Sequence, residues 1–147
     1  MAKVKKPNKT PKYQLGHVNP VEAPNFTMNA AELFEYLPPE TDFIIKRIYW
    51  LTKVKGEKKS GQHAHSDEDE LFVVMQGSAT IVLDDGGGLK PIKLSENDTV
   101  WIPKFIWHGF SKLSEDCIVL ALTSTNYDPE RKGYINDPAE FAKLSSK

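Results

Sequence analysis

The scarcest residue in this chain of 147 residues is cysteine, which occurs once, at Cys117. One thiol cannot form an internal disulfide, so a disulfide-stabilised secreted scaffold is excluded, and the apolar run CIVLALTST predicts that Cys117 is buried. No apolar run approaches the about 20 residues of a membrane-spanning helix, and the basic N-terminus lacks the apolar core of a signal peptide. We therefore expect a cytoplasmic protein with no membrane partner.

An excess of either charge is also absent. The sequence has 19 Lys and Arg against 20 Asp and Glu, a formal net charge of −1. This balance provides no overall attraction to polyanions, so we expect no nucleic-acid partner. The length and the 39% of hydrophobic residues are typical of one globular domain with its own core. The lysine-rich residues 1–12 are expected to form a flexible basic tail, and residues 13–147 the domain.

Short segments rich in β-branched and aromatic residues dominate the chain from residue 42 onward. Turn residues separate them: Gln76-Gly77-Ser78 indicates a hairpin, and DDGGG at 84–88 indicates a tight turn. About eight short strands with little helix between them predict an all-β sandwich or barrel. The segments include FIIKRIYWLTKV, ELFVVMQ, SATIVLDD, LKPIKL, DTVWIP, WHGFSKL and CIVLALTST.

Two short helices are expected at the ends of the domain. The first is predicted in NAAELFEYLPPE, residues 29–40, where the two prolines must end it. The second is predicted in NDPAEFAKLSSK, where Asp137 can cap the helix and Pro138 suits its first turn.

Two histidines stand one residue apart in GQHAHSDEDELFVVMQG. Alternate residues of a strand project to the same face, so His63 and His65 would enter one pocket if that face lines a barrel. Glu70 begins the next apolar strand, and IPKFIWHGF supplies His108 farther along the chain. Taken alone, the pair can also be read as ordinary polar residues at a strand edge.

These segments resemble the two sequence motifs of the cupin superfamily. GEKKSGQHAHSDEDELFVVMQG is similar to the first motif, and PKFIWH to the second, although a phenylalanine replaces a usual glycine there. The resemblance implies a single jelly-roll β-barrel. In metal-binding cupins the matching residues hold one divalent ion, and their chemistry suits Fe, Mn, Ni, Co or Zn. The candidate metal ligands are His63, His65, Glu70 and His108.

Residues 43–141 also resemble a narrower cupin group, the WxcM-like sugar 3,4-ketoisomerases. The similar segments include IIKRIYWLTKVKGE, QGSATIVLDDG and the tail NYDPERKGYINDPAEF. The resemblance implies a homodimer that moves a ketone between C4 and C3 of a nucleotide-linked 6-deoxyhexose, with no metal and no organic cofactor. It also implies that His63 and His65 are the catalytic pair, and imidazole suits proton transfer near neutral pH.

The chain departs from that group at three positions. Ser60 stands where an arginine is usual, and serine cannot replace a bidentate phosphate contact. Glu70 and His108 also differ from the isomerase pattern, and both differences favour a metal site. A basic patch at the pocket mouth is expected from Lys59, and Tyr49 and Trp107 are candidate sugar contacts or core residues.

Three functions therefore compete. The first is keto-sugar isomerisation, in which any bound metal would polarise the ketone. The second is a metal-dependent cupin of another class, such as an oxygenase, with a site of three histidines and one glutamate. The third is a sugar-binding cupin without enzymatic activity. Metal content, nucleotide-sugar binding and alanine replacement of the histidine pair would discriminate among them.

Overall fold

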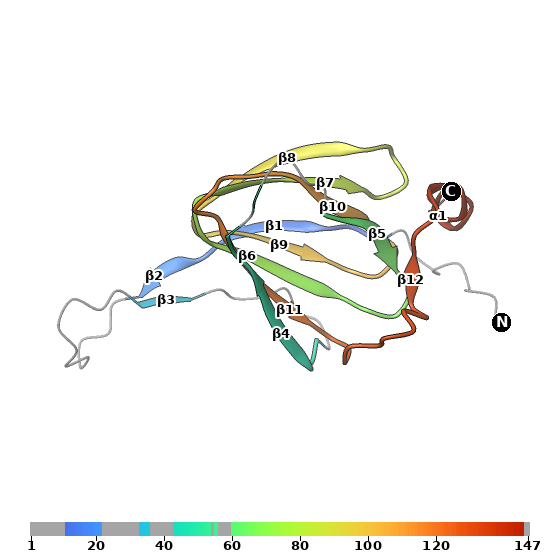
Figure 1. Ribbon diagram of the computed structural model, residues 1–147, viewed down its shortest axis with the longest axis horizontal. Coiled ribbons are helices and arrows are strands. Elements are labelled where there is room, and N and C mark those ends of the chain that lie inside the picture. Colours follow the sequence, from blue (N-terminus) through green and yellow to red (C-terminus); the bar gives the residue numbers. More distant parts are fainter. Residues whose placement is uncertain (1–10, 22–32, 36–42, 54, 56–59, 146–147) are drawn as a thin grey trace.

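Two antiparallel five-stranded sheets face each other across one core (Figure 1). The computed structural model describes residues 11–21, 33–35, 43–53, 55 and 60–145. One sheet has the order β1-β9-β6-β11-β4 and the other β12-β5-β10-β7-β8, and a separate two-stranded ribbon joins β2 to β3. The all-β prediction is confirmed. The strands are β1 (Gln14–His17), β2 (Asn19–Val21), β3 (Leu33–Glu35), β4 (Arg47–Leu51), β5 (Ser60–His65), β6 (Glu70–Gln76), β7 (Ser78–Asp84), β8 (Lys90–Ser95), β9 (Asp98–Ile102), β10 (Trp107–Leu113), β11 (Ile118–Thr123) and β12 (Tyr134–Ile135).

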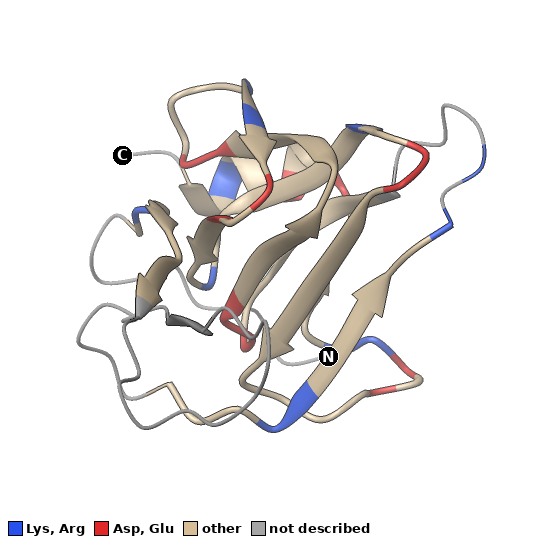
Figure 2. Ribbon diagram, turned by 90° about the vertical axis from the view of Figure 1, so that its left-hand side faces the viewer, with Lys and Arg blue, Asp and Glu red and all other residues tan. Residues whose placement is uncertain are grey.

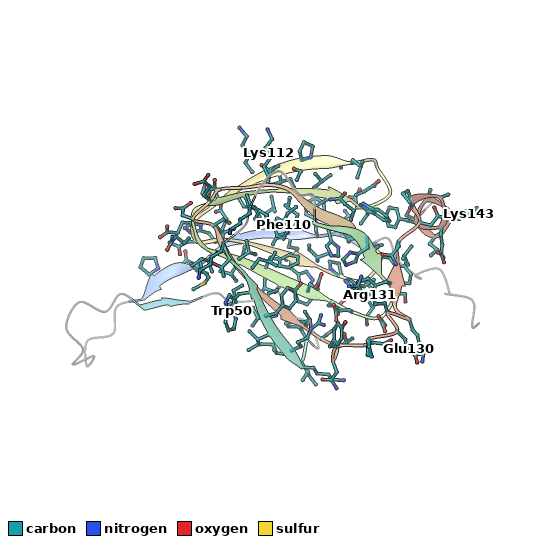
Figure 3. All side chains as sticks on the ribbon, in the orientation of Figure 1. Trp50, Phe110, Lys112, Glu130, Arg131 and Lys143 are labelled. Atoms are coloured by element: carbon teal, nitrogen blue, oxygen red, sulfur yellow. The ribbon has the colours of Figure 1, made fainter. Side chains whose placement is uncertain are left out.

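The core lies between the sheets because alternate side chains of each strand turn inward. Ile81 and Leu83 of β7 are fully buried, and they meet Val119 and Ala121 of β11 in the same cluster. Phe110 lies in the interior of the barrel in Figure 3 and packs edge-on against the Phe72 ring, 5.2 Å between centroids. Cys117 is buried in this core, as predicted.

The expected hairpin at Gln76-Gly77-Ser78 is wrong. Strand β6 pairs with β9 and β11, whereas β7 pairs with β8 and β10, so this segment carries the chain from one sheet to the other. Gly77 has a φ of 72°, and a Cβ there would overlap Ser114 Oγ. The glycine therefore permits a corner between sheets. The turn at 84–88 does join two paired strands, β7 and β8, as predicted.

The predicted N-terminal helix is also wrong where the structure describes it. Leu33–Glu35 forms β3, which pairs antiparallel with β2, and the rest of 29–40 lies outside the described residues. A helix stopped by two prolines would have fewer residues than the about 12–15 needed for stability on its own, and pairing with β2 supplies backbone partners instead. In Figure 1 the β2–β3 ribbon projects from the barrel.

The predicted C-terminal helix is present as α1 (Pro138–Ser145). Its N-terminus is capped as predicted, because Asp137 Oδ1 accepts a hydrogen bond from the backbone N–H of Ala139 at 2.9 Å. The side chain of Phe141 anchors the helix on the outer face of the second sheet, in a cluster with Trp107 and Ala64.

Basic and acidic residues are interspersed along the ribbon, with neither sign confined to one side of the described chain (Figure 2). None of the helices in the described part is both long and apolar enough to cross a membrane. Of the expected basic tail, only residues 11 and 12 fall within the described ranges.

Candidate functional site

Three histidines converge at one end of the barrel. Strands β5 and β10 are neighbours, and their register places His63 directly opposite His108, with ring centroids 4.8 Å apart. His65 follows two residues later on the same face of β5, and its Nε2 lies 2.9 Å from Nε2 of His63. The period of two in a strand explains why this pair shares one pocket. His65 and His108 are buried, whereas His63 is half-buried.

Glu70 reaches the same point from the opposite sheet. It is the first residue of β6, is 2% exposed, and places Oε2 2.9 Å from His108 Nε2 and 3.6 Å from His65 Nε2. Tyr49 on β4 donates a hydrogen bond of 3.1 Å to Glu70 Oε1. Both sheets therefore contribute to one buried polar cluster, and the structure brings together the four predicted metal ligands and Tyr49.

The electrostatics of the cluster differ from residue to residue. Burial alone would raise the pKa of Glu70, but contacts with His108 and His65 hold that pKa well below its usual value. Burial alone would lower the pKa of His108, but the Glu70 carboxylate raises it. Burial, together with the neighbouring His108 and His65, lowers the pKa of His63 to about 3. At neutral pH, His63 is therefore the neutral imidazole, and the opposite shifts of the Glu70 and His108 pKa values both favour an ion pair between these two residues.

Glu68, within the acidic run DEDE, is a second buried carboxylate. It is 4% exposed, and its Oε1 lies 3.5 Å from His65 Nε2. Arg47 pairs with it at 3.3 Å, and the Thr125 hydroxyl donates to its Oε2. Burial raises the pKa of Glu68. Its partners come from β4 and from the segment after β11, so no local pattern in the sequence could identify it.

Tyr134 is another site residue that the sequence did not reveal. It lies on β12 and pairs with His65 through the sheet. Its ring contacts both imidazoles, at 4.6 Å from His63 and 4.5 Å from His65 between centroids. The tyrosine therefore forms a wall of the histidine pocket.

The other two residues predicted to contact the sugar are not seen at the histidine pocket. Trp107 lies on the face of β10 opposite to that of His108. Its ring packs against Phe141 of α1, with 5.5 Å between the ring centroids, so the structure does not bring it to the histidines. Lys59 falls outside the described residues. Beside the site is a small cavity of about 40 Å³, lined in part by Arg47, His65 and Tyr134. It has room for a water molecule but not for a hexose.

The donor set suits two kinds of chemistry. The nitrogen atoms of the three histidines lie within 4.8 Å of one another, and the carboxylate of Glu70 is adjacent, which fits a divalent transition metal. The contact of 2.9 Å between His63 and His65 equally suits proton transfer, because one nitrogen must donate while the other accepts.

Comparison with known proteins identifies the family. The family model described as "FdtA: WxcM-like, C-terminal" matches residues 18–146. A protein of Aneurinibacillus thermoaerophilus named TDP-4-oxo-6-deoxy-alpha-D-glucose-3,4-oxoisomerase is 33% identical over 106 residues, covering 71% of this chain and 75% of that protein.

Solved structures agree with this assignment. WlaRA (TDP-fucose-3,4-ketoisomerase) from Campylobacter jejuni is 29% identical, with a TM-score of 0.76 over 91% of this chain and 96% of that chain. A 3,4-ketoisomerase from Helicobacter canadensis is 30% identical, with a TM-score of 0.74 over 90% and 96% of the two chains. These similarities confirm the predicted cupin-type barrel. The chain belongs to the FdtA family of WxcM-like, C-terminal domains.

Proposed function

We propose that the chain is a 3,4-ketoisomerase that acts on a TDP-linked 4-keto-6-deoxyhexose. In this reaction a proton leaves C3 to give an enediolate across C3 and C4, the hydroxyl proton on the C3 oxygen is lost while the C4 oxygen gains one, and a proton is returned to C4, which leaves the ketone at C3. The reaction needs one group that accepts and one that donates a proton next to these carbons. The observation that carries the proposal is the pair His63 and His65, with Nε2 atoms 2.9 Å apart in a largely buried pocket.

The two histidines have different environments, which supports different roles. His63 is half-buried and neutral, so its imidazole is the one that can meet a substrate and accept the C3 proton. His65 is buried behind it, with oxygens of Glu68 and Glu70 at 3.5 and 3.6 Å that would stabilise a proton passed on to it. A positive charge on His108, which the Glu70 carboxylate favours, would stabilise the enediolate oxygen electrostatically.

The named relatives support the choice of substrate class. The Aneurinibacillus protein and the Campylobacter protein are both named as isomerases of TDP-linked 6-deoxyhexoses, and each aligns with most of this chain. A nucleotide-sugar partner is therefore the natural expectation here as well.

Deuterium exchange from the solvent tests the proposal. The enzyme is incubated in D2O with TDP-4-keto-6-deoxyglucose, and NMR follows deuterium at C3 and C4 and the appearance of the 3-keto product. His63→Asn and His65→Asn should each reduce turnover about 10²- to 10⁴-fold while binding of TDP persists. TDP-glucose, which has no ketone, is the negative control. A wild-type protein that neither isomerises the sugar nor exchanges its protons contradicts the proposal.

A second candidate function is metal-dependent catalysis. The three histidine nitrogens and the Glu70 carboxylate would hold the ion, which would act as a Lewis acid on a substrate oxygen. Elemental analysis of protein purified without chelators tests it. Isomerase activity that survives chelation, in protein with less than one equivalent of metal, would reject this candidate.

We also propose that the chain functions as a homodimer. The support is an exposed apolar surface on and before the edge strand β4, where Ile44 is 70%, Ile48 57% and Trp50 65% exposed. Trp50 points away from the core in Figure 3. Several large apolar side chains exposed on and near one edge strand are typical of a protein interface.

A further inference from the structure

The loop between β11 and β12 ends in a tightly bonded turn. Both carboxylate oxygens of Asp128 accept backbone N–H groups, from Glu130 at 2.9 Å and from Lys132 at 3.0 Å. The backbone N–H of Arg131 donates to Asp128 O at 3.0 Å, and that of Tyr134 donates to Arg131 O at 3.1 Å. Arg131 itself has a φ of 51°, an uncommon conformation for a residue with a Cβ, so these bonds define where its side chain starts.

This turn is joined to the strand that carries the histidine pair. Ser66, the residue after His65, donates to Gly133 O through both its backbone N–H, at 2.8 Å, and its hydroxyl, at 3.2 Å. A Cβ on Gly133 would overlap the Asp67 carboxylate, so the two segments approach as closely as only glycine allows. The position of Arg131 relative to the histidines is therefore defined by the backbone.

The side chain of Arg131 lies over the ring that forms the pocket wall. Its Cζ is 5.2 Å from the centroid of Tyr134, and the Tyr134 ring contacts His63 and His65. Figure 3 shows Arg131 beside β12, with Glu130 farther out on the loop. The guanidinium is thus held at the edge of the pocket rather than inside it.

The charge of Arg131 is available to a ligand. Lys132 pairs with Glu130, and the Asp128 oxygens are occupied by backbone N–H groups. Arg131 is exposed and makes no ion pair with any residue in the described ranges. Arg47, the other arginine near the histidines, is paired with the buried Glu68.

We propose that Arg131 binds the diphosphate group of the substrate at the mouth of the histidine pocket. This inference rests on the proposed function, because a hexose whose C3 and C4 lie at His63 carries its diphosphate on C1, directed out of the pocket. A guanidinium presents paired N–H donors to phosphate oxygens, and stacking on an aromatic ring reduces the freedom lost on binding. Arg131 is thus a binding residue that selects for a nucleotide-linked sugar over a free one.

The test compares Arg131→Gln with Lys132→Gln, which removes one positive charge from the neighbouring residue of the same turn. Calorimetric titration with TDP at 50 mM and 200 mM NaCl should show affinity about tenfold lower for Arg131→Gln, with a weaker salt dependence. Lys132→Gln should bind TDP within about twofold of the wild-type protein, and Arg131→Lys should recover part of the loss. Thermal unfolding of each variant checks the fold.

Kinetics separate this role from a structural one. Loss of a diphosphate contact raises KM for the TDP-sugar and leaves kcat within about threefold, whereas a displaced Tyr134 would lower kcat. The inference is overturned if the Arg131→Gln variant binds TDP as tightly as the wild-type protein, or if only its kcat changes. Either result leaves the isomerase proposal intact. A wild-type protein that binds no TDP overturns both.

Discussion

Replacing Glu70 by Gln tests the buried ion pair at the centre of the site. The amide keeps the shape of the side chain and can still accept the Tyr49 hydrogen bond, but it removes the charge that lies 2.9 Å from His108 Nε2. His108 is 3% exposed, so its positive charge would lose its partner in a place that water does not reach. A hydrogen bond to a charged group contributes about 1.5–3 kcal/mol, and neutralisation of His108 recovers part of it. We therefore expect unfolding at pH 6 to become easier by about 1–3 kcal/mol.

The pH dependence of stability distinguishes this ion pair from ordinary packing. The Glu70 pKa is lowered from 4.5 in the folded state, so its contribution is complete above pH 4.5 and is lost as pH falls through the lowered pKa. The His108 pKa is raised from 6.5, so its contribution is complete below pH 6.5 and is lost as pH rises through the raised pKa. The pair therefore stabilises the fold most between pH 4.5 and 6.5.

Urea unfolding of metal-free protein from pH 4 to 9 measures this window. The difference between wild type and Glu70→Gln should be largest at pH 5–6 and should shrink on both sides. A double-mutant cycle with His108→Gln isolates the interaction between the two residues, and Glu130→Gln on the exposed loop is the control. A difference that stays constant across the pH range would refute the ion-pair argument.

Three further predictions address the rest of the molecule. Cys117 is 1% exposed and burial raises the pKa of its thiol, so a maleimide should label it only after unfolding, as mass spectrometry would show; rapid labelling of the folded protein would contradict the assigned core. Gly77→Ala should destabilise the fold by about 1–3 kcal/mol in urea, because φ is 72° and the added Cβ meets Ser114; unchanged stability would show that the corner can relax. Trp50→Lys should dissociate the proposed dimer in sedimentation velocity without changing the circular dichroism spectrum, and a variant that stays dimeric would place the interface elsewhere.

The sequence predicted the barrel well because its strands carry their own signals. ELFVVMQ and WHGFSKL coincide with β6 and β10, since β-branched and aromatic runs bounded by turn residues have few alternatives. Pairing partners were harder to predict. The segment around Gly77 is typical of both a hairpin and a corner between sheets, and only the choice of partners by β6 and β7 decides between them.

The contrast between local sequence signals and distant contacts also explains which site residues could be predicted. His63 and His65 are two residues apart on one strand, and the motif spacing adds Glu70 and His108, so these four were identified together. Tyr134 and Glu68 gain their roles from distant contacts, since Tyr134 pairs with His65 across strands and Glu68 depends on Arg47. Nothing within a few residues of either one indicates those contacts.

The two carboxylates beside His65 give the site an asymmetry that the histidine spacing alone does not. Glu70 is neutralised largely by His108, whereas Glu68 is held by Arg47 and Thr125, so the two oxygens near His65 Nε2 belong to separate networks. Both lie within 3.6 Å of His65 Nε2, whereas Glu70 also acts on His63 through its charge. In the proposed reaction, a proton that His63 takes from the substrate would lie closer to these two carboxylates if it passed on to His65. The arrangement of charge thus supports the proposed roles, in which the half-buried His63 meets the substrate and the buried His65 receives the proton.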